Sequence, residues 1–292
     1  MRMARVTSFT NQWGNTMRNL SGVLIFSTGC FFHSAYAQEA AEETGPFASQ
    51  NFTSTMYLTT DYRFRGISNS DGPAIQGSID WTYSGLYLGV WASNTEFSDD
   101  NIEIDYYGGY RYTWSAITFD VSGIYYHYPG EDENSFDEFD PFLGQEADYG
   151  ETHVGANYTF DLDFSPAVGV HYYWSPDFFG EDGDGHYVQG NAGVTVPLAF
   201  SSTGLGVYGI VGYQDVEGDK SSGALGGYHY VWWQTGANVT VKGFKLDLSY
   251  VDVEESTALK AFYSPTTLPD GRIADFSELT EGTVLFTVSR TF

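Results

Sequence analysis

Cysteine, basic residues and long apolar runs are all scarce in this chain of 292 residues. Its single cysteine, Cys30, excludes a disulfide scaffold. Only 12 Lys and Arg residues stand against 38 Asp and Glu residues, so the formal net charge is -26. A chain without a basic patch cannot neutralise phosphates, and we therefore expect no nucleic acid among its partners. No run of 18 apolar residues follows residue 37, so we expect no membrane-spanning helix.

Glycine and aromatic residues are abundant instead. The chain has 34 Gly, 23 Tyr, 22 Phe and 7 Trp, and aromatic residues make up 18% of it. Long disorder is not expected, because disordered chains are poor in aromatic residues. Charged residues make up only 17%, against about 25% in an ordinary soluble domain. This composition is typical of a β-rich protein.

The one long apolar run, Leu20 to Phe32, lies near the N-terminus. It is too short to cross a bilayer as a helix, but it fits the apolar region of a signal peptide. Ala35-Tyr36-Ala37 follows as a cleavage pattern of small residues. We therefore predict a signal peptide at 1–37. An exported β-rich chain whose mature part lacks cysteine indicates the bacterial envelope.

Two alternatives concern this leader. The stretch before Met17 is long for the start of a signal peptide, so Met17 is an alternative first residue. Gly29-Cys30 resembles the end of a lipoprotein signal, although Ser27 stands where that signal has a bulky aliphatic residue. With cleavage after Ala37, we predict a short periplasmic segment at 38–52 and a β-barrel at 53–292.

The mature chain alternates apolar and polar residues with a period of two, as strands with one oily and one wet face do. In Ser54 to Phe64, for example, the polar residues Thr55 and Thr59 fall on one face, and the other, apolar face is formed by Met56, Leu58, Tyr62 and Phe64. Such segments recur near 54–64, 74–83, 86–93, 102–113, 117–128, 150–160, 162–174, 186–196, 205–214, 229–241, 244–252 and 283–292. Most are as long as the roughly 9–11 residues of a membrane-crossing strand, whereas soluble strands average about 5–6.

The connections between these segments alternate in length. Short connections are expected at 84–85, 114–116, 161, 197–204 and 242–243. Long ones are expected at 65–73, 94–101, 129–149, 175–185, 215–228 and 253–282. This alternation predicts an all-β fold: a transmembrane up-and-down antiparallel barrel of about 12 strands, with short periplasmic turns and long acidic extracellular loops. A soluble β-sandwich or propeller is the alternative fold.

The chain ends on Phe292, and Val284, Phe286 and Val288 share its face. A terminal Phe on such a strand resembles the C-terminal signal of outer-membrane barrels, so the barrel-assembly machinery is an expected partner. Arg290 departs from that signal, because its position usually holds an apolar residue.

Motifs in the first third of the predicted barrel resemble a known family. They are Thr60-Asp-Tyr-Arg-Phe-Arg-Gly-Ile-Ser68 leading into Pro73-Ala-Ile-Gln-Gly77, Ser84-Gly-Leu-Tyr-Leu-Gly-Val-Trp-Ala-Ser93, Glu103-Ile-Asp-Tyr-Tyr-Gly108 and Tyr125-Tyr-His-Tyr-Pro-Gly130. Together they are similar to the proteobacterial Gcw_chp family, also called TorF-type porins. The resemblance implies an outer-membrane β-barrel labelled as a porin without a defined substrate, and it brings no catalytic residues.

Charged side chains of the polar face are expected to line the lumen. The acidic ones are Asp61, Asp80, Glu103, Asp105, Asp120, Glu151, Asp163 and Asp247, and the basic ones are Arg63, Arg65, Arg111 and Lys245. Arg63 and Arg65 follow the first strand, where they would face acidic groups across a constriction. Because charges inside a pore set its selectivity, the acidic excess predicts a mild preference for cations or neutral polar solutes. The alternative is that these charges pair with one another and fill a narrow barrel.

The loops at 129–149 and 175–185 carry acidic residues and no basic ones. One interpretation is that they share divalent cations with lipopolysaccharide phosphates, and the other is that they are simply solvated. Tyr126, Tyr128, Tyr173 and Trp232 fall on the inward face, where they would fill the barrel or stack on sugar rings. The histidines lack metal-ligand spacing, and we expect neither a metal nor a cofactor.

We therefore predict a passive channel for small polar solutes in the outer membrane, surrounded by its lipid and lipopolysaccharide. A non-conducting surface barrel that acts through its acidic loops is the main alternative. A barrel lipid hydrolase is less favoured, because no histidine of the mature chain has a serine two residues later, although a distant serine could still pair with one. The chain is thus predicted not to be an enzyme.

Overall fold

The computed structural model describes residues 45–96, 101–129, 147–178, 183–201, 203–218, 227–264, 266–267, 273–274 and 276–292. The predicted signal peptide at 1–37 lies outside these residues, and so do residues 130–146 and 179–182 of the two acidic stretches. No helix among the described residues is long and apolar enough to cross a membrane.

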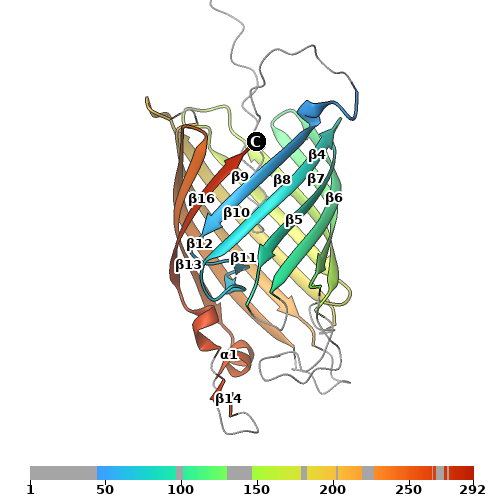
Figure 1. The fold of residues 1–292 in the computed structure, drawn as a ribbon, viewed down its shortest axis with the longest axis vertical. Coiled ribbons are helices and arrows are strands. Elements are labelled where there is room, and N and C mark those ends of the chain that lie inside the picture. The colour runs from blue at the N-terminus through green and yellow to red at the C-terminus, as the bar shows by residue number, and fades with distance from the viewer. Residues whose placement is uncertain are drawn as a thin grey trace, which may run out of the picture.

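Twelve long strands close into one barrel (Figure 1). They are β1 (Phe52–Thr59), β4 (Ala74–Tyr83), β5 (Leu86–Asn94), β6 (Ile102–Trp114), β7 (Ile117–His127), β8 (Tyr149–Thr159), β9 (Ala167–Ser175), β10 (Gly185–Val196), β11 (Leu205–Val216), β12 (Tyr228–Val241), β13 (Phe244–Glu255) and β16 (Thr283–Thr291). Each strand pairs antiparallel with its neighbours in sequence, and β16 closes the ring by pairing with β1, with Thr55 opposite Thr291. The predicted up-and-down barrel of 12 strands is confirmed.

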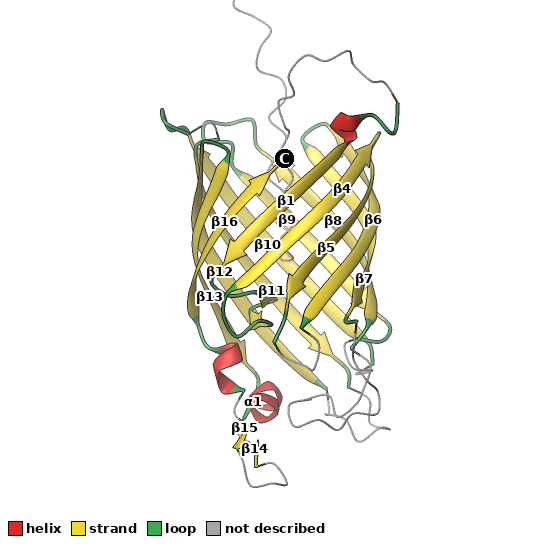
Figure 2. Cartoon of the chain, in the orientation of Figure 1, coloured by secondary structure: helices red, strands yellow, loops and turns green. Residues whose placement is uncertain are grey.

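The remaining elements are short and lie in the connections. They are η1 (Ser49–Asn51), β2 (Arg63–Phe64), β3 (Ile67–Ser68), α1 (Thr257–Tyr263), β14 (Thr266–Thr267), β15 (Ile273–Ala274) and η2 (Ser277–Thr280). Figure 2 shows α1 and β14 at the end of the barrel opposite the C-terminus. The N-terminus of β1 and the chain end meet at the other end, where Phe292 exchanges backbone hydrogen bonds with Ser54. An even strand number places both ends on the side of the short turns, as expected.

The tight turns follow from residues that accept left-handed backbone angles. Ser84 and Gly85 have φ angles of 51° and 89°, and Lys242 and Gly243 have 54° and 81°. Positive φ at both central residues is the requirement of a two-residue type I′ hairpin, whose twist matches that of the strands. Gly85 is also sterically needed, because a Cβ atom there would lie 2.6 Å from the carbonyl oxygen of Arg111.

The predicted start of one strand was wrong. The seventh long strand was expected to begin at residue 162, but the corresponding strand, β9, begins at Ala167. Phe164 and Ser165 have φ angles of 67° and 41°, so residues 160–166 form a turn rather than strand. Alternation alone could not reveal this, since an apolar residue at every second position also fits an exposed turn beside a membrane.

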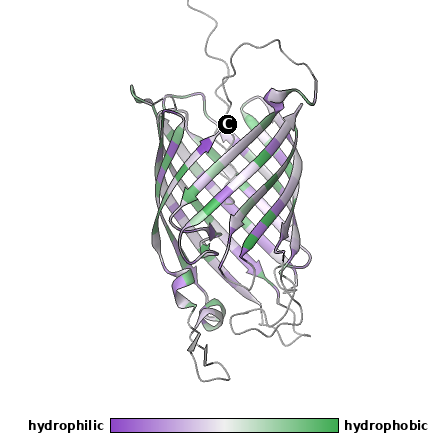
Figure 3. Cartoon of the chain, in the orientation of Figure 1, coloured by the Kyte–Doolittle hydropathy of each residue, from purple (hydrophilic) through white to green (hydrophobic). Residues whose placement is uncertain are grey.

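Hydrophobic and hydrophilic residues are interspersed along the strands (Figure 3), and their exposure shows a barrel that is apolar outside and polar inside. In β4, Ile75 and Ile79 are 64% and 66% exposed, whereas Gln76, Ser78 and Asp80 are buried. A protein in water would gain free energy by the opposite arrangement, because exposed apolar area is unfavourable. Apolar-out and polar-in alternation is the pattern of a transmembrane barrel. It excludes the soluble sandwich and propeller.

A lysine at Ile79 should therefore reduce the stability of the membrane-inserted barrel. We expect Ile79→Lys to lower the free energy of unfolding by about 2–4 kcal/mol, because the charge would face hydrocarbon near the middle of β4. Leu162 is equally exposed but lies in the 160–166 turn, so Leu162→Lys should cost only about 0–1 kcal/mol. Urea unfolding in lipid vesicles measures both. Equal losses would contradict the placement of β4 in the bilayer.

Candidate functional site: the lumen and its inward-folded hairpin

The first long loop folds into the barrel. The sequence predicted a strand up to Phe64, but β1 ends at Thr59, and residues 60–73 turn inward as a small hairpin that contains β2 and β3. We call this segment the lumen hairpin. Its tip is Arg65-Gly66, with φ angles of 48° and 91°. Its base is tied by the Tyr62 amide, which donates to the Ser70 hydroxyl at 2.8 Å.

Arg65 anchors the tip of the lumen hairpin across the barrel. Its guanidinium donates to Glu151 on β8 and to Gln214 on β11, both at 2.6 Å, and lies 3.9 Å from the ring centre of Tyr187. Arg65 is only 2% exposed, and Glu151 is 3% exposed. Arg65 therefore meets an acidic group on the opposite wall of the barrel. Such charge-assisted hydrogen bonds are the strong ones in proteins.

Tyr62 and Arg63 fasten the two sides of the hairpin. The Tyr62 hydroxyl donates to Glu103 on β6 at 3.0 Å, and its ring meets Trp91 on β5 edge-on. Arg63 donates to Asp61 at 2.5 Å and to the carbonyl oxygens of Leu279 and Glu281, at 3.0 Å and 2.9 Å. Alternation had placed Tyr62 on the outward apolar face. That was wrong, because Tyr62 is 4% exposed and points into the barrel.

Gly66 allows the tip to touch the far wall. A Cβ atom at Gly66 would lie 2.8 Å from Trp232 on β12 and 2.8 Å from Val253 on β13. The hairpin thus contacts strands from β5 to β13 around most of the barrel. It crosses the lumen in the half that lies nearer the long loops.

Eleven of the twelve predicted pore-lining residues lie on the inward face or in the lumen hairpin. Arg111 and Asp120 pair at 2.8 Å, and Asp120 also accepts from the Tyr87 hydroxyl at 2.8 Å. Asp80 accepts from Ser78 at 2.8 Å and from Tyr107. Asp163 is the exception: it lies in the 160–166 turn with an exposed side chain.

Acidic groups outnumber basic groups inside the barrel. Arg63, Arg65 and Arg111 each pair with one carboxylate, those of Asp61, Glu151 and Asp120. Glu103 and Asp105, two residues apart on β6, are 0% and 3% exposed. One oxygen of Asp105 has no hydrogen-bond partner among the described residues. The lumen therefore keeps carboxylates beyond those that the arginines neutralise.

The predicted inward aromatic residues are also inside. Tyr126, Tyr128, Tyr173 and Trp232 are 1%, 3%, 3% and 2% exposed. Tyr126 stacks on Tyr149 and donates to Glu151 at 3.0 Å. These rings pack among themselves and around the hairpin, which favours barrel filling over sugar stacking.

Sequence reasoning missed several residues of the site. Gln214 on β11 and Tyr187 on β10 both contact Arg65. Both occupy inward-facing positions in the alternation of their strands, and this pattern is the signal that would have found them. Ser122 and His153 are 2.9 Å apart, and His153 bonds His171 at 3.0 Å. Ser122 and His153 are far apart in the sequence, so a search for a serine two residues after a histidine does not find this pair.

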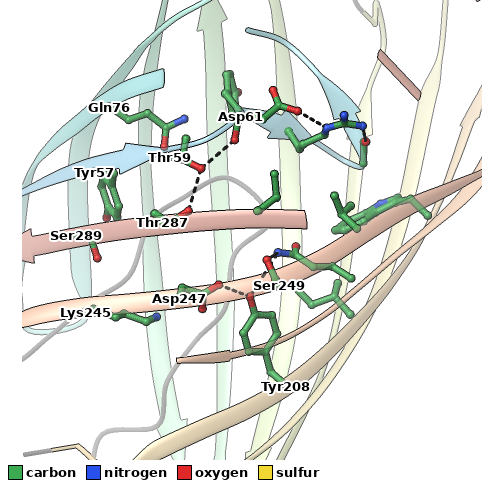
Figure 4. Close-up of a pocket in the computed structure, with 18 residues that line it drawn as sticks. Tyr57, Thr59, Asp61, Gln76, Tyr208, Lys245, Asp247, Ser249, Thr287 and Ser289 are labelled. Atoms are coloured by element: carbon green, nitrogen blue, oxygen red, sulfur yellow. Dashed lines mark hydrogen bonds and ion pairs between the residues drawn. The ribbon is translucent and has the colours of Figure 1, made fainter. Parts of the chain in front are cut away.

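A cavity of about 110 Å³ lies beside the lumen hairpin on its periplasmic side. Figure 4 shows its walls, formed by β1, β4, β11, β12, β13 and β16. Lys245 and Asp247 lie together on the β13 wall, and Asp247 accepts from the Tyr208 hydroxyl at 2.9 Å. Ser249, also on β13, accepts a hydrogen bond from the Gln234 side chain at 2.9 Å. Ile210, Trp232, Val251 and Leu285 form an apolar part of the lining.

Outside the lumen, one group of side chains has the composition of a metal site. Asp184, His186 and Glu217, at the loop ends of β10 and β11, place ligand atoms within 4.8 Å of one another. His186 is also 2.8 Å from the Tyr172 hydroxyl on the outer surface. Glu217 is exposed and the other two are half-buried, so we assign no metal to this group.

Loop 253–282 lies at the mouth of the barrel and supports the lumen hairpin. The α1 helix begins after Ser256, whose hydroxyl accepts from the Leu259 amide at 3.2 Å. Leu259 is 1% exposed and packs in the cluster that contains Tyr230 and Trp232. Together with the carbonyls of Leu279 and Glu281, this loop holds the lumen hairpin in place.

Several solved barrels are similar in overall arrangement. The KdgM porin is 9% identical, with a TM-score of 0.46 over 82% of this chain and 98% of that chain. An outer-membrane channel from Pseudomonas putida F1 is 11% identical, with a TM-score of 0.46 over 88% and 100%. OmpT, an outer membrane protein of Vibrio cholerae, is 10% identical, with a TM-score of 0.39 over 82% and 98%.

Likenesses of this size say nothing about what the present chain binds or transports. No curated protein matches its sequence. The family described as "bacterial protein of unknown function (Gcw_chp)" matches residues 40–292. That range covers almost the whole chain, and the protein belongs to the Gcw_chp family.

Proposed function

We propose that this protein is an outer-membrane channel for passive diffusion of small hydrophilic solutes, with a mild preference for cations. The observation that carries the proposal is the polar interior crossed by the lumen hairpin, whose Arg65 reaches Glu151 on the opposite wall. In this proposal the inward-folded hairpin narrows the barrel, and a 12-stranded barrel lies between filled eight-stranded and open sixteen-stranded cases. The lumen hairpin is then the constriction.

Selectivity follows from the charges that remain after pairing. Seven acidic and four basic side chains of the predicted set lie inside, and three of the acidic ones are paired with arginines. The excess negative charge favours cations through the local potential.

In the same proposal, lipopolysaccharide and lipid surround the apolar outer face. The barrel-assembly machinery recognises Phe292, which is 60% exposed.

A liposome-swelling assay tests this function. Vesicles that contain the refolded barrel should swell in glycerol and in a pentose, more slowly in a hexose, and not in a trisaccharide, because the hairpin narrows the passage. Vesicles with an equal amount of unfolded chain are the control. Equal swelling in all four solutes would indicate leakage around the barrel, and no swelling in any would contradict a channel.

The second candidate is a non-conducting surface barrel. The burial of Arg65 at 2% exposure favours it, because a hairpin that packs this closely can close the lumen. Its acidic loops would then carry the function. Absence of swelling from a barrel shown to be folded would select this alternative.

Lipid hydrolysis is not proposed. Ser122 and His153 do pair, but they face the lumen, and His153 is 1% exposed. Lipid lies on the other side of the barrel wall, so this pair has no route to an acyl ester. We assign it to the polar filling of the barrel.

A further inference from the structure

We propose that the cavity beside the lumen hairpin binds a small zwitterionic solute, such as a free α-amino acid with a short side chain. Its carboxylate would lie toward Lys245 and its ammonium toward Asp247. The inference rests on the proposed channel function, because it names the class of solute that the lumen takes up.

The β13 wall presents two opposite charges to one cavity. Lys245 and Asp247 are two residues apart on β13, so they share a face, and their Cα atoms are about 7 Å apart in an extended strand. Lys245 is only 7% exposed, which places its charge in the wall rather than in bulk water. A solute that carries both charges a few ångströms apart can meet both groups at once. A neutral sugar or a simple ion cannot.

Asp247 has a further reason to accept a cation. One of its oxygens accepts from Tyr208 at 2.9 Å, while the other is buried and has no hydrogen-bond partner among the described residues. A buried carboxylate oxygen without a donor is costly. An ammonium group in the cavity supplies that donor after a small rotation of the carboxylate.

The pair on the opposite side of the lumen shows what a purely structural arrangement looks like. Arg111 and Asp120 bond each other at 2.8 Å, the Tyr87 hydroxyl donates to the same carboxylate, and Arg111 lies 3.9 Å from the Tyr87 ring centre. Asp120 is 1% exposed. These charges are turned toward each other and do not line the cavity. Lys245 and Asp247 also attract each other, but they line a space that a solute can enter.

The size and remaining lining limit the solute. A cavity of about 110 Å³ is well below the roughly 300–1,000 Å³ of ordinary ligand pockets. Ile210 and Leu285 give part of it an apolar surface. Alanine fits this description, with its methyl group against the apolar part, better than a large or strongly polar side chain.

Isothermal titration of the full refolded barrel in detergent micelles tests the inference from the solute side. Alanine should bind at least about tenfold more tightly than alanine methyl ester or N-acetylalanine, since each derivative loses one charge-assisted contact. These derivatives require no mutation, so a folding defect cannot confuse the result. Equal affinity for all three, or tighter binding of glycerol, would overturn the inference.

Two variants test the wall itself. Lys245→Met and Asp247→Asn should each weaken alanine binding about tenfold or more. Lys245→Met should leave the affinity for methylammonium unchanged, and Asp247→Asn should leave the affinity for acetate unchanged. Lys260→Met and Glu278→Gln, which change exposed residues outside the cavity, are the charge-matched controls. If the controls weaken binding equally, the site is elsewhere. Conductance in KCl without amino acid is recorded separately, so that loss of the channel and loss of the site remain distinguishable.

Discussion

Replacing Arg65 by methionine is expected to lower the free energy of unfolding by about 3–5 kcal/mol, because it leaves a buried carboxylate without its cation. Glu151 is 3% exposed, and it forms its ion pair with Arg65 at 2.6 Å. The second variant, Arg65→Met with Glu151→Gln, removes the unpaired charge and should recover a large part of the loss. Urea unfolding of the vesicle-inserted barrel measures all three chains.

The control is an ion pair of the same charges at the surface. Lys260 and Glu255 are 3.9 Å apart, and the Lys260 side chain is 64% exposed. Lys260→Met should therefore cost no more than about 1 kcal/mol. If Arg65→Met costs as little as this control, or if the double variant is no more stable than Arg65→Met, the anchor is not the buried pair that we describe.

Replacing Arg65 by glutamine should shift ion selectivity strongly toward cations. The tip of the lumen hairpin would then lose its guanidinium while Glu151 remains beside it, and Glu103 and Asp105 lie on β6. In a tenfold KCl gradient, the zero-current potential should move toward the cation limit of about 59 mV. Planar-bilayer recording of the wild type and of Arg65→Gln gives this potential directly.

Lys260→Gln serves as the control for this measurement, because Lys260 lies on α1 outside the lumen and its loss removes the same unit charge. Its zero-current potential should match that of the wild type. A shift of equal size in both variants would mean that surface charge, and not the constriction, sets the selectivity. A shift toward anions in Arg65→Gln would contradict our placement of the carboxylates.

The strands could be predicted from the sequence because the bilayer imposes a simple rule on every one of them. Ile79 faces lipid and Asp80 faces the lumen, and this alternation is visible without knowing any contact. The two-residue turns were equally visible, since Ser84-Gly85 and Lys242-Gly243 have the residues that positive φ demands. The same alternation predicted that Glu103, Glu151 and the buried tyrosines face the interior, and they do.

The lumen hairpin could not be predicted in the same way. Tyr62 and Phe64 continue the alternation of β1, so a local pattern makes them a lipid-facing strand. Their true position depends on partners far away in the sequence, such as Glu151, which is 86 residues from Arg65. It also depends on the close approach of Gly66 to Trp232. Which residues meet across a barrel depends on how the sheet closes and on the register of its strands, and one sequence does not reveal either.

The most direct test of the account is single-channel conductance of the wild type beside a variant with residues 61–72 replaced by a short glycine-serine linker. The lumen hairpin crosses the interior, so the account predicts small discrete steps from the wild type and severalfold larger steps from the shortened variant. Heat-modifiable gel mobility shows that both barrels are folded. Equal steps from the two proteins, or no steps from either, would contradict the claim that this hairpin is the constriction of a channel.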